Sequence, residues 1–450
     1  MFKKILVANR GEIARRVIRT AKKLGVRTVA VYSDVDATAP FVKDADESVR
    51  IGPPPPRESY LNAQAILDAA RQTGAEAIHP GYGFLSENAT FAQQVMDAGL
   101  VFIGPPPSAM HKLGDKIEAK RNVSSAGVPV VPGFIGVLES EDHAVAEATK
   151  IGFPVMLKAS AGGGGIGMHR CKTEADLRKN FSDARKKGEQ FFGRSHVFIE
   201  RLIERPRHVE VQIVGDASGK VHALFERECS VQRRHQKVLE EAPSPVVTPE
   251  MRLKMAEAAV RAGESAGYRN AGTVEFIVDG NTREFFFLEV NARLQVEHPV
   301  TEMVLGVDLV EAQLRVACGE PLPFDPASLR IQGHALEARI CAEDPEKRFL
   351  PSPGTITALT IPEGPGIRVD HGVEQGSVVS PFYDSLVMKL ITHGTDRNQA
   401  IERMLGALKQ LKIEGIKTNI SLHERVVGSD VFRSGALHTE LLAEAFGLKS

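Results

Sequence analysis

Short apolar runs alternate with amphipathic stretches through the first quarter of the chain. Residues 5–8 are continuously apolar, as in a strand covered on both faces, and an apolar stripe of helical spacing follows over 13–24. Further elements are predicted as strands at 28–32, 77–80 and 101–104 and as a helix near 65–70. Because strands and helices alternate at this spacing, we expect a parallel sheet with helices on both faces over residues 1–115.

The first predicted strand-to-helix turn reads Asn9-Arg10-Gly11-Glu12. It lacks the G-x-G-x-x-G fingerprint, in which glycines let the backbone approach a dinucleotide pyrophosphate. A nicotinamide-dependent dehydrogenase is therefore disfavoured. A proline-rich stretch at 104–107 marks the expected end of this first domain. Residues 116–325 mix predicted hairpins and helices, and a strand-rich segment begins near 326.

A polar series of strict period two follows the apolar residues 285–288. Glu289, Asn291, Arg293, Gln295 and Glu297 would share one face of an extended chain. An edge strand with a solvated side would show the same alternation. Here the series begins where a buried strand emerges, which favours an active-site wall. A straight strand would span about 26 Å, too long for one small substrate, so we expect a bend near Arg293.

The bulk composition is that of an ordinary globular protein, with 42% hydrophobic and 25% charged residues. Lys+Arg 56 against Asp+Glu 57 leaves a formal charge of −1, so neither nucleic acid nor a membrane surface is an expected partner. The four cysteines form no Cys-x-x-Cys pair, and no apolar run of about 18 residues occurs. We expect a cytoplasmic protein of roughly two to four domains.

A glycine-rich loop at 161–167 follows an apolar strand that ends at Lys158. The missing side chains would let backbone N–H groups approach a polyanion closely. Met168 and His169 stand where a Walker A motif requires Lys and Ser/Thr, and a strand is expected after the loop. A flap between two strands that covers nucleotide phosphates is the better analogy, although a flexible surface hairpin would have the same composition.

Two further charged features indicate a nucleotide site. Residues 230–237 hold three cations and His235, which suit an anion clamp and equally a solvated basic loop. Glu275 lies within an otherwise apolar strand, where a carboxylate needs a partner. Glu289 on a neighbouring strand could share a divalent cation with it, or Glu275 could belong to a core ion pair. Paired glutamates, a glycine-rich flap and several lysines together indicate ATP with magnesium.

These residues resemble those of the biotin carboxylase family of the ATP-grasp superfamily. The resemblance runs from Lys4 to about Leu448. Its most specific segments are 9–14, 79–88, 232–237, 295–302 and 349–354. It implies an α/β fold, α+β overall, with a Rossmann-like N-terminal domain at 1–115 and an ATP-grasp domain at 116–325. Within the ATP-grasp domain it implies a mobile lid at about 131–203, and it places a C-terminal mixed-sheet domain at 326–450.

The resemblance also implies roles for individual residues. The residues implied for ATP binding are Lys116, Lys158, Gly164, Gly165, Glu200, Arg201, Leu202, Ile203, His208, His235, Glu275 and Glu289. The residues implied to hold a pair of magnesium or manganese ions are Glu275, Glu289 and Asn291. Those implied to cradle bicarbonate are Lys237, Arg293, Gln295 and Val296, with Glu297 as general base and Arg339 facing the biotin ureido group.

The chemistry implied is ATP-dependent carboxylation of biotin. A base would deprotonate bicarbonate as it attacks the γ-phosphate, and a closing lid would protect the labile carboxyphosphate from water. Residues 387–390 contain Lys389 but lack a Met-Lys-Met biotin-acceptor signature. The biotin carboxyl carrier protein and the carboxyltransferase, of an acyl-CoA carboxylase for example, are therefore expected as separate chains. The resemblance also implies a homodimer.

One residue departs from the family pattern. The flap usually carries Arg or Lys immediately before its final glycine, and here that residue is Ile166. Loss of this cation is expected to alter the KM for ATP. Two alternatives remain open at this point: another ATP-grasp ligase that joins a carboxylate to an amine, and a non-catalytic subunit that binds nucleotide.

Overall fold

The computed structural model describes residues 1–159, 167–193 and 195–448. The N-terminal unit is built on one parallel sheet with strand order β3-β2-β1-β4-β5. Its strands are β1 (Lys4–Val7), β2 (Arg27–Ser33), β3 (Glu47–Gly52), β4 (Ala77–His79) and β5 (Val101–Phe102). Its helices are α1 (Gly11–Lys23), α2 (Pro40–Asp44), α3 (Ala63–Thr73), α4 (Ala89–Asp97) and α5 (Pro107–Gly114). The parallel sheet predicted over 1–115 is confirmed.

The continuous apolar character of β1 follows from burial on both of its faces. Leu6 packs in one hydrophobic cluster together with residues of α3 and α4, whereas Ile5 and Val7 pack in another with α1. Successive side chains of a strand point to opposite faces, so both clusters require apolar residues in the same short run. The second cluster continues into α10 (His298–Leu305) and α11 (Leu309–Ala317), and α11 contacts both α1 and the central sheet.

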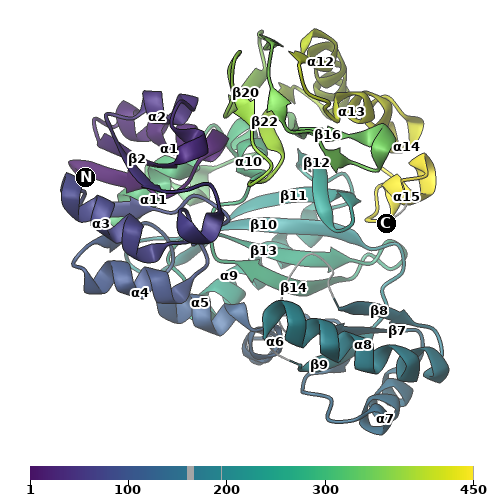
Figure 1. Cartoon of the computed structure of the whole chain (residues 1–450). Helices are drawn as coiled ribbons and strands as arrows, with labels where there is room; N and C mark the ends of the chain where they lie inside the picture. The colour runs from purple at the N-terminus through teal and green to yellow at the C-terminus, as the bar shows by residue number, and fades with distance from the viewer. Residues whose placement is uncertain (160–166, 194, 449–450) are drawn as a thin grey trace.

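An antiparallel sheet of eight strands forms the centre of the molecule (Figure 1). Its order is β14-β13-β10-β11-β12-β15-β22-β20. The bounds are β10 (Arg207–Gly215), β11 (Val221–Arg233), β12 (Gln236–Ala242), β13 (Asn270–Val278), β14 (Phe285–Asn291), β15 (His334–Cys341), β20 (Ile367–His371) and β22 (Leu386–Gly394). Helix α9 (Pro249–Ala266) packs against β10 and β11.

A smaller antiparallel sheet lies beyond one edge of the central sheet, at the bottom of Figure 1. It has the order β6-β9-β7-β8, with β6 (Gly133–Phe134), β7 (Val155–Ala159), β8 (Met168–Cys171) and β9 (Val197–Arg201). Helices α7 (Glu141–Ile151) and α8 (Glu174–Phe192) cover it, and the side chain of Thr173 caps α8 in a capping box. This unit, which we call the lid, has its own hydrophobic cluster around Leu157, Leu177 and Ile199. Helix α6 (Lys116–Ser125) precedes it.

The C-terminal segment extends the central sheet as well as forming structure of its own. Strands β15, β22 and β20 continue the order begun by β10 to β14, so the segments on either side of residue 325 share one sheet. Small two-stranded ladders join β16 (Glu343–Asp344) to β17 (Leu350–Pro351), β18 (Gly354–Thr355) to β21 (Val378–Val379), and β19 (Ala358–Thr360) to β23 (Lys412–Glu414). The helices are α12 (Arg397–Gln410), α13 (Ile420–Val427), α14 (Asp430–Arg433) and α15 (Leu441–Phe446).

The observed fold is thus a mixed α/β architecture with a parallel N-terminal sheet and antiparallel sheets beyond it. Within the described part of the chain, no helix combines the length and the apolar character needed to cross a bilayer.

Candidate active site

Two adjoining cavities lie over the central sheet and beside the lid. The larger has a volume of about 520 Å³ and the smaller about 170 Å³. The residues that line both cavities are His208, His235, Glu275 and Glu289. The smaller cavity extends to the lid strands β7 and β9, and the larger extends to the turn after β1 and to β15. This arrangement provides two binding volumes with a shared wall.

Almost every candidate residue that the structure describes lines one of these cavities. Those on the smaller cavity are Lys116, Lys158, Glu200, Arg201, Leu202, Ile203, His208, His235, Glu275 and Glu289. Those on the larger cavity are His208, His235, Lys237, Glu275, Glu289, Asn291, Arg293, Gln295, Val296 and Arg339. Glu297 lies behind the wall of the larger cavity and is fully buried. Gly164, Gly165 and Ile166 lie outside the described residues.

The chain bends where the length of the polar series requires it. Strand β14 ends at Asn291, the backbone bends at Arg293, and Glu297 precedes α10. The Arg293 guanidinium donates to Asn291 Oδ1 at 3.1 Å and to Gln295 Oε1 at 2.9 Å. It also donates to Glu87 Oε2 at 2.9 Å. The predicted bend is confirmed. Strand β14, which carries Glu289 and Asn291, is an edge strand of the central sheet, and Glu289, Asn291, Arg293 and Gln295 line the larger cavity.

Lys237 lies at the centre of a cage of three carboxylates. Its ammonium is 2.5 Å from Glu210, 2.8 Å from Glu275 and 2.6 Å from Glu297. Burial opposes the charge, but the three carboxylates outweigh burial and hold the pKa of Lys237 well above its ordinary value. Lys237 therefore stays charged, and it faces the larger cavity as a fixed cation.

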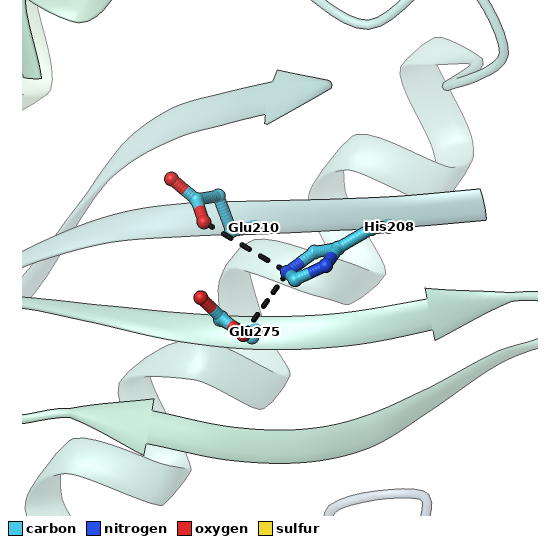
Figure 2. A group of neighbouring side chains, drawn as sticks. All are labelled: His208, Glu210 and Glu275. Atoms are coloured by element: carbon cyan, nitrogen blue, oxygen red, sulfur yellow. Dashed lines mark ion pairs between the residues drawn. The ribbon is translucent and has the colours of Figure 1, made fainter. Parts of the chain in front are cut away.

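His208 joins the same carboxylate cluster (Figure 2). It projects from β10 with Glu210, and Glu275 reaches toward both from the neighbouring β13. The His208 Nε2 atom is 3.0 Å from Glu275 Oε2 and 4.0 Å from Glu210 Oε2. Burial lowers the pKa of the imidazole, but Glu275 outweighs burial and raises it overall. The core ion pair that the sequence left open for Glu275 is present.

Glu275 and Glu289 are direct cross-strand partners on β13 and β14. Side chains of such a pair share one face of the sheet and lie about 5 Å apart at Cβ, and Asn291 follows on the same face. Glu289 also lies 3.4 Å from Lys116. Two carboxylates and an amide oxygen are a donor set that suits Mg²⁺ or Mn²⁺. The set fits a metal that accompanies a nucleotide, and its role in metal binding stays a prediction.

Glu297 is held between two cations from different strands. Its Oε1 atom is 2.6 Å from Lys237 on β12, and its Oε2 atom is 2.9 Å from Arg339 on β15. Burial raises the pKa of a carboxyl group, but Lys237 and Arg339 outweigh burial and keep the pKa of Glu297 well below its ordinary value. The carboxylate is therefore ionised, and it faces two residues of the cavity wall.

The smaller cavity contains a second buried group of charges. Glu200 on β9 forms ion pairs with both Lys158 on β7 and Lys120 on α6. Burial opposes ionisation of Glu200, but the two ammonium groups outweigh it and lower its pKa to about 2. Burial lowers the pKa of Lys120. This group places two cations beside the cavity, where nucleotide phosphates would compete with Glu200 for them.

Some residues of the basic run at 230–237 make structural contacts, and others line the cavities. It forms the β11–β12 hairpin, with Arg234 and His235 at the turn in left-handed backbone conformations. Arg233 pairs with Glu343 at 3.2 Å and stacks on the ring of Phe349. The run also lines the cavities, through Gln232, His235, Gln236 and Lys237.

Strands β7 and β8 flank the glycine-rich loop and pair in antiparallel fashion, and Ala159 N–H donates to the Gly167 carbonyl at 3.1 Å. The loop therefore connects two strands of a hairpin, as predicted. A Walker A loop would lead from a strand into a helix, so that alternative is excluded.

Several site residues were missed from the sequence. Lys120 is buried against Glu200, Glu210 against Lys237, and Glu240 against Arg339. Glu87 binds Arg293, and it lies inside the 79–88 segment that signalled the family. Glu87 could have been proposed as a site residue because it is a charged residue within a segment that resembles the family. Glu210 and Glu240 lie in strands whose other residues are largely buried, which was the available signal for them.

Models of known protein families match nearly the whole chain. Residues 1–110 match the biotin carboxylase N-terminal domain, residues 115–324 match the ATP-binding domain of the carbamoyl-phosphate synthase L chain, and residues 337–444 match the biotin carboxylase C-terminal domain. The fold, the paired cavities and these matches define an ATP-dependent ligase.

Individual relatives agree with the family models. The chain is 52% identical to a biotin carboxylase of Halalkalibacterium halodurans, covering 100% of this chain and 99% of the relative. It is 51% identical to biotin carboxylase 2 of Bacillus subtilis, covering 99% and 100%. The chain belongs to the biotin carboxylase family.

Solved structures of related proteins have the same fold. The biotin carboxylase domain dimer of Hydrogenobacter thermophilus 2-oxoglutarate carboxylase, in complex with MgADP, ADP and bicarbonate, superposes with a TM-score of 0.95 at 47% identity over 100% of this chain and 98% of that one. A complex of biotin carboxylase from Campylobacter jejuni with an ATP ligand gives 0.96 at 44% identity over 99% of both chains.

Proposed function

We propose that this chain carboxylates biotin on a carrier protein, using ATP and bicarbonate, and releases ADP and phosphate. The observation that supports this most directly is the position of Glu297. Its carboxylate is buried between Lys237 and Arg339, at the wall of the larger cavity and next to the cavity that the lid borders. A base, two cations and a neighbouring cavity lined by further lysines are the parts that the first step requires.

The first step is activation of bicarbonate. In the observed arrangement both oxygens of Glu297 are occupied by cations, which makes the carboxylate a weak base. A bicarbonate anion bound between Arg293, Gln295 and Lys237 would compete for those cations. Because it would draw Lys237 away from Glu297, the pKa of Glu297 would rise as the substrate enters. The base is thus activated by the substrate that it deprotonates.

Transfer of the γ-phosphoryl group takes place on the smaller cavity. Lys116 and Lys158 line this cavity and would neutralise negative charge on the phosphates. Glu275, Glu289 and Asn291 would hold Mg²⁺ or Mn²⁺, which supplies charge neutralisation to the phosphates when bound. His208, held by Glu275, is part of the wall that the two cavities share. Residues 200–203, at the end of the last lid strand β9 and directly after it, line the nucleotide side.

The second step uses the larger cavity. Carboxyphosphate would divide into CO2 and phosphate, and phosphate would remove the ureido proton of biotin. Arg339 lines the cavity beside Glu297 and stays protonated, so it suits stabilisation of the resulting enolate. Carboxylation of that enolate by CO2 completes the reaction.

The biotin carrier protein, and a carboxyltransferase such as that of an acyl-CoA carboxylase, are the partners we propose. We also propose a homodimer and a cytoplasmic location. The four cysteines are unpaired in the structure, which supports a reducing compartment.

ADP release, measured with and without bicarbonate and biotin, tests the function. We expect ADP release to require bicarbonate and to rise with biotin. We expect Glu297→Gln to abolish bicarbonate-dependent ADP release, both with and without biotin. Release that is indifferent to bicarbonate, but stimulated by a carboxylate and an amine, would instead identify another ligase. Binding of ATP without any turnover would identify a non-catalytic subunit.

A further inference from the structure

Arg339 is held by two carboxylates, and the proposed function accounts for only one of them. Besides Glu297, the Arg339 guanidinium binds Glu240 Oε1 at 2.5 Å. Glu240 lies on β12, one strand away from Arg339 on β15, and it is nearly fully buried. We propose that Glu240 is a positioning residue that holds the Arg339 guanidinium in place for biotin. The inference rests on the role proposed above for Arg339.

Among the described residues, the Glu240 carboxylate is hydrogen-bonded to Arg339 alone. Its second oxygen, Oε2, has no hydrogen-bond partner within the described residues. Directly opposite on β15 lies Glu337, which is fully buried and has no partner for either carboxyl oxygen among those same residues. Two buried carboxyl groups are costly unless they stabilise the neighbouring cation. The single strong contact that Glu240 makes is to Arg339.

The two carboxylates differ in what the reaction does to them. Glu297 takes the bicarbonate proton, and its attraction for Arg339 weakens at that moment. Glu240 does not line either cavity, so no substrate competes for its contact. A guanidinium released by both partners would be free to change rotamer, whereas one retained by Glu240 keeps its remaining N–H groups toward the larger cavity.

The electrostatics strengthen the hold of Glu240 on Arg339 at the stage when the hold of Glu297 weakens. Burial raises the pKa of Glu240 to about 7, Arg339 opposes that rise, and the charge on Glu297 adds to it. Lys237 also lowers it, and Glu337 faces it from β15. Protonation of Glu297 removes one negative neighbour and so favours the ionised form of Glu240. Glu240 therefore holds Arg339 more strongly at the stage when Glu297 holds it less.

The test compares two adjacent glutamates of β12. Glu240→Gln keeps the shape of the side chain and removes its charge. Glu241→Gln does the same for the next residue, which faces away from Arg339 and pairs with His334 and Arg397, each at 2.6 Å. Both variants lose one buried carboxylate from one strand, so the control separates a general loss of stability from an effect on Arg339.

We expect Glu240→Gln to lower kcat/KM for free biotin about tenfold, the loss of one charge-assisted hydrogen bond. It should lower the rate of bicarbonate-dependent ATP cleavage without biotin much less. Glu240→Asp should restore part of the biotin kinetics. Glu241→Gln should lower the melting temperature without this difference between the two activities.

Three results would overturn the inference. One is unaltered biotin kinetics in Glu240→Gln while Arg339→Ala is defective, which leaves the proposed function intact. A second is an equal loss of both activities in Glu240→Gln, which means a structural role alone. The third is unaltered biotin kinetics in Arg339→Ala itself, which would remove the role of Arg339 from the proposed function as well.

Discussion

Lys389 is a fully buried lysine whose substitution should change both stability and bicarbonate binding. It lies on β22, directly opposite Arg339 on β15. Its ammonium donates to the Val296 carbonyl at 2.9 Å and lies 3.2 Å from Glu12 Oε2. Glu12 belongs to the first turn of α1 and also accepts from the Tyr82 hydroxyl. One ammonium therefore links the N-terminal unit, the central sheet and the turn that would cradle bicarbonate.

Lys389→Met removes the cation and leaves the Glu12 carboxylate buried without it. Burial already raises the pKa of Glu12, and Lys389 is the main group that opposes the rise. Breaking a buried ion pair on one side costs about 3–5 kcal/mol. The hydrogen bond to Val296 accounts for about 1.5–3 kcal/mol when made to a charged donor. Since the effects overlap, we expect a loss of about 3–5 kcal/mol in unfolding free energy. We also expect the KM for bicarbonate to rise about tenfold.

Urea unfolding and bicarbonate-dependent ADP release measure the two effects separately. The Glu12→Gln/Lys389→Met double variant should regain most of the stability, because no carboxylate is left buried without a cation. Its KM for bicarbonate should stay high, because the Val296 carbonyl still lacks its donor. A double variant with a restored KM would show that the contact to Val296 is unimportant. A single variant as stable as the wild type would refute the reasoning about Glu12.

Two further predictions concern the lid and the effect of pH. Glu200→Gln should destabilise the nucleotide-free chain, because Lys120 and Lys158 lose their shared carboxylate. ATP should then raise the melting temperature more than in the wild type, because its phosphates replace the lost negative charge. An equal ATP-induced shift would contradict this. His423 is buried and donates to the Arg339 carbonyl, and burial lowers its pKa from 6.5 to about 4. The folded chain keeps His423 neutral, so the unfolding free energy is highest above pH 6.5. It falls as the pH drops toward 4, by about 3 kcal/mol in total. Unfolding of His423→Gln should therefore depend less on pH over that range, and an unchanged pH dependence would count against this.

The period of the sequence pattern was enough to predict much of the fold. The alternation over 1–115 predicted the parallel sheet because a strand buried on both faces must be apolar throughout, as Ile5 to Val7 are. The bend near Arg293 followed from length alone. The approach of Glu275 to Glu289 was predictable because Glu275 interrupts one apolar strand and Glu289 directly follows the apolar residues of a neighbouring strand, which places both carboxylates beside one another.

The ion-pair partners could not be predicted in the same way. Which carboxylate meets Lys237 or Arg339 depends on the order and register of strands far apart in sequence, and alternation fixes only the face. Glu240 and Glu241 illustrate the limit: adjacent in sequence, they bind Arg339 and Arg397 respectively. The continuity of the central sheet across residue 325 was likewise invisible, because strand pairing between segments leaves no periodic signal.

That continuity has a consequence for the timing of the reaction. Lys237, Glu275, Glu297 and Arg339 lie on or beside one eight-stranded sheet, whereas Lys158 belongs to the separate lid sheet. Movement of the lid would change the nucleotide end but would leave the spacing between Glu297 and Arg339 unaltered. The lid would then govern how long carboxyphosphate is retained, and so the ratio of ADP released to biotin carboxylated. Biotin affinity would then not depend on the position of the lid.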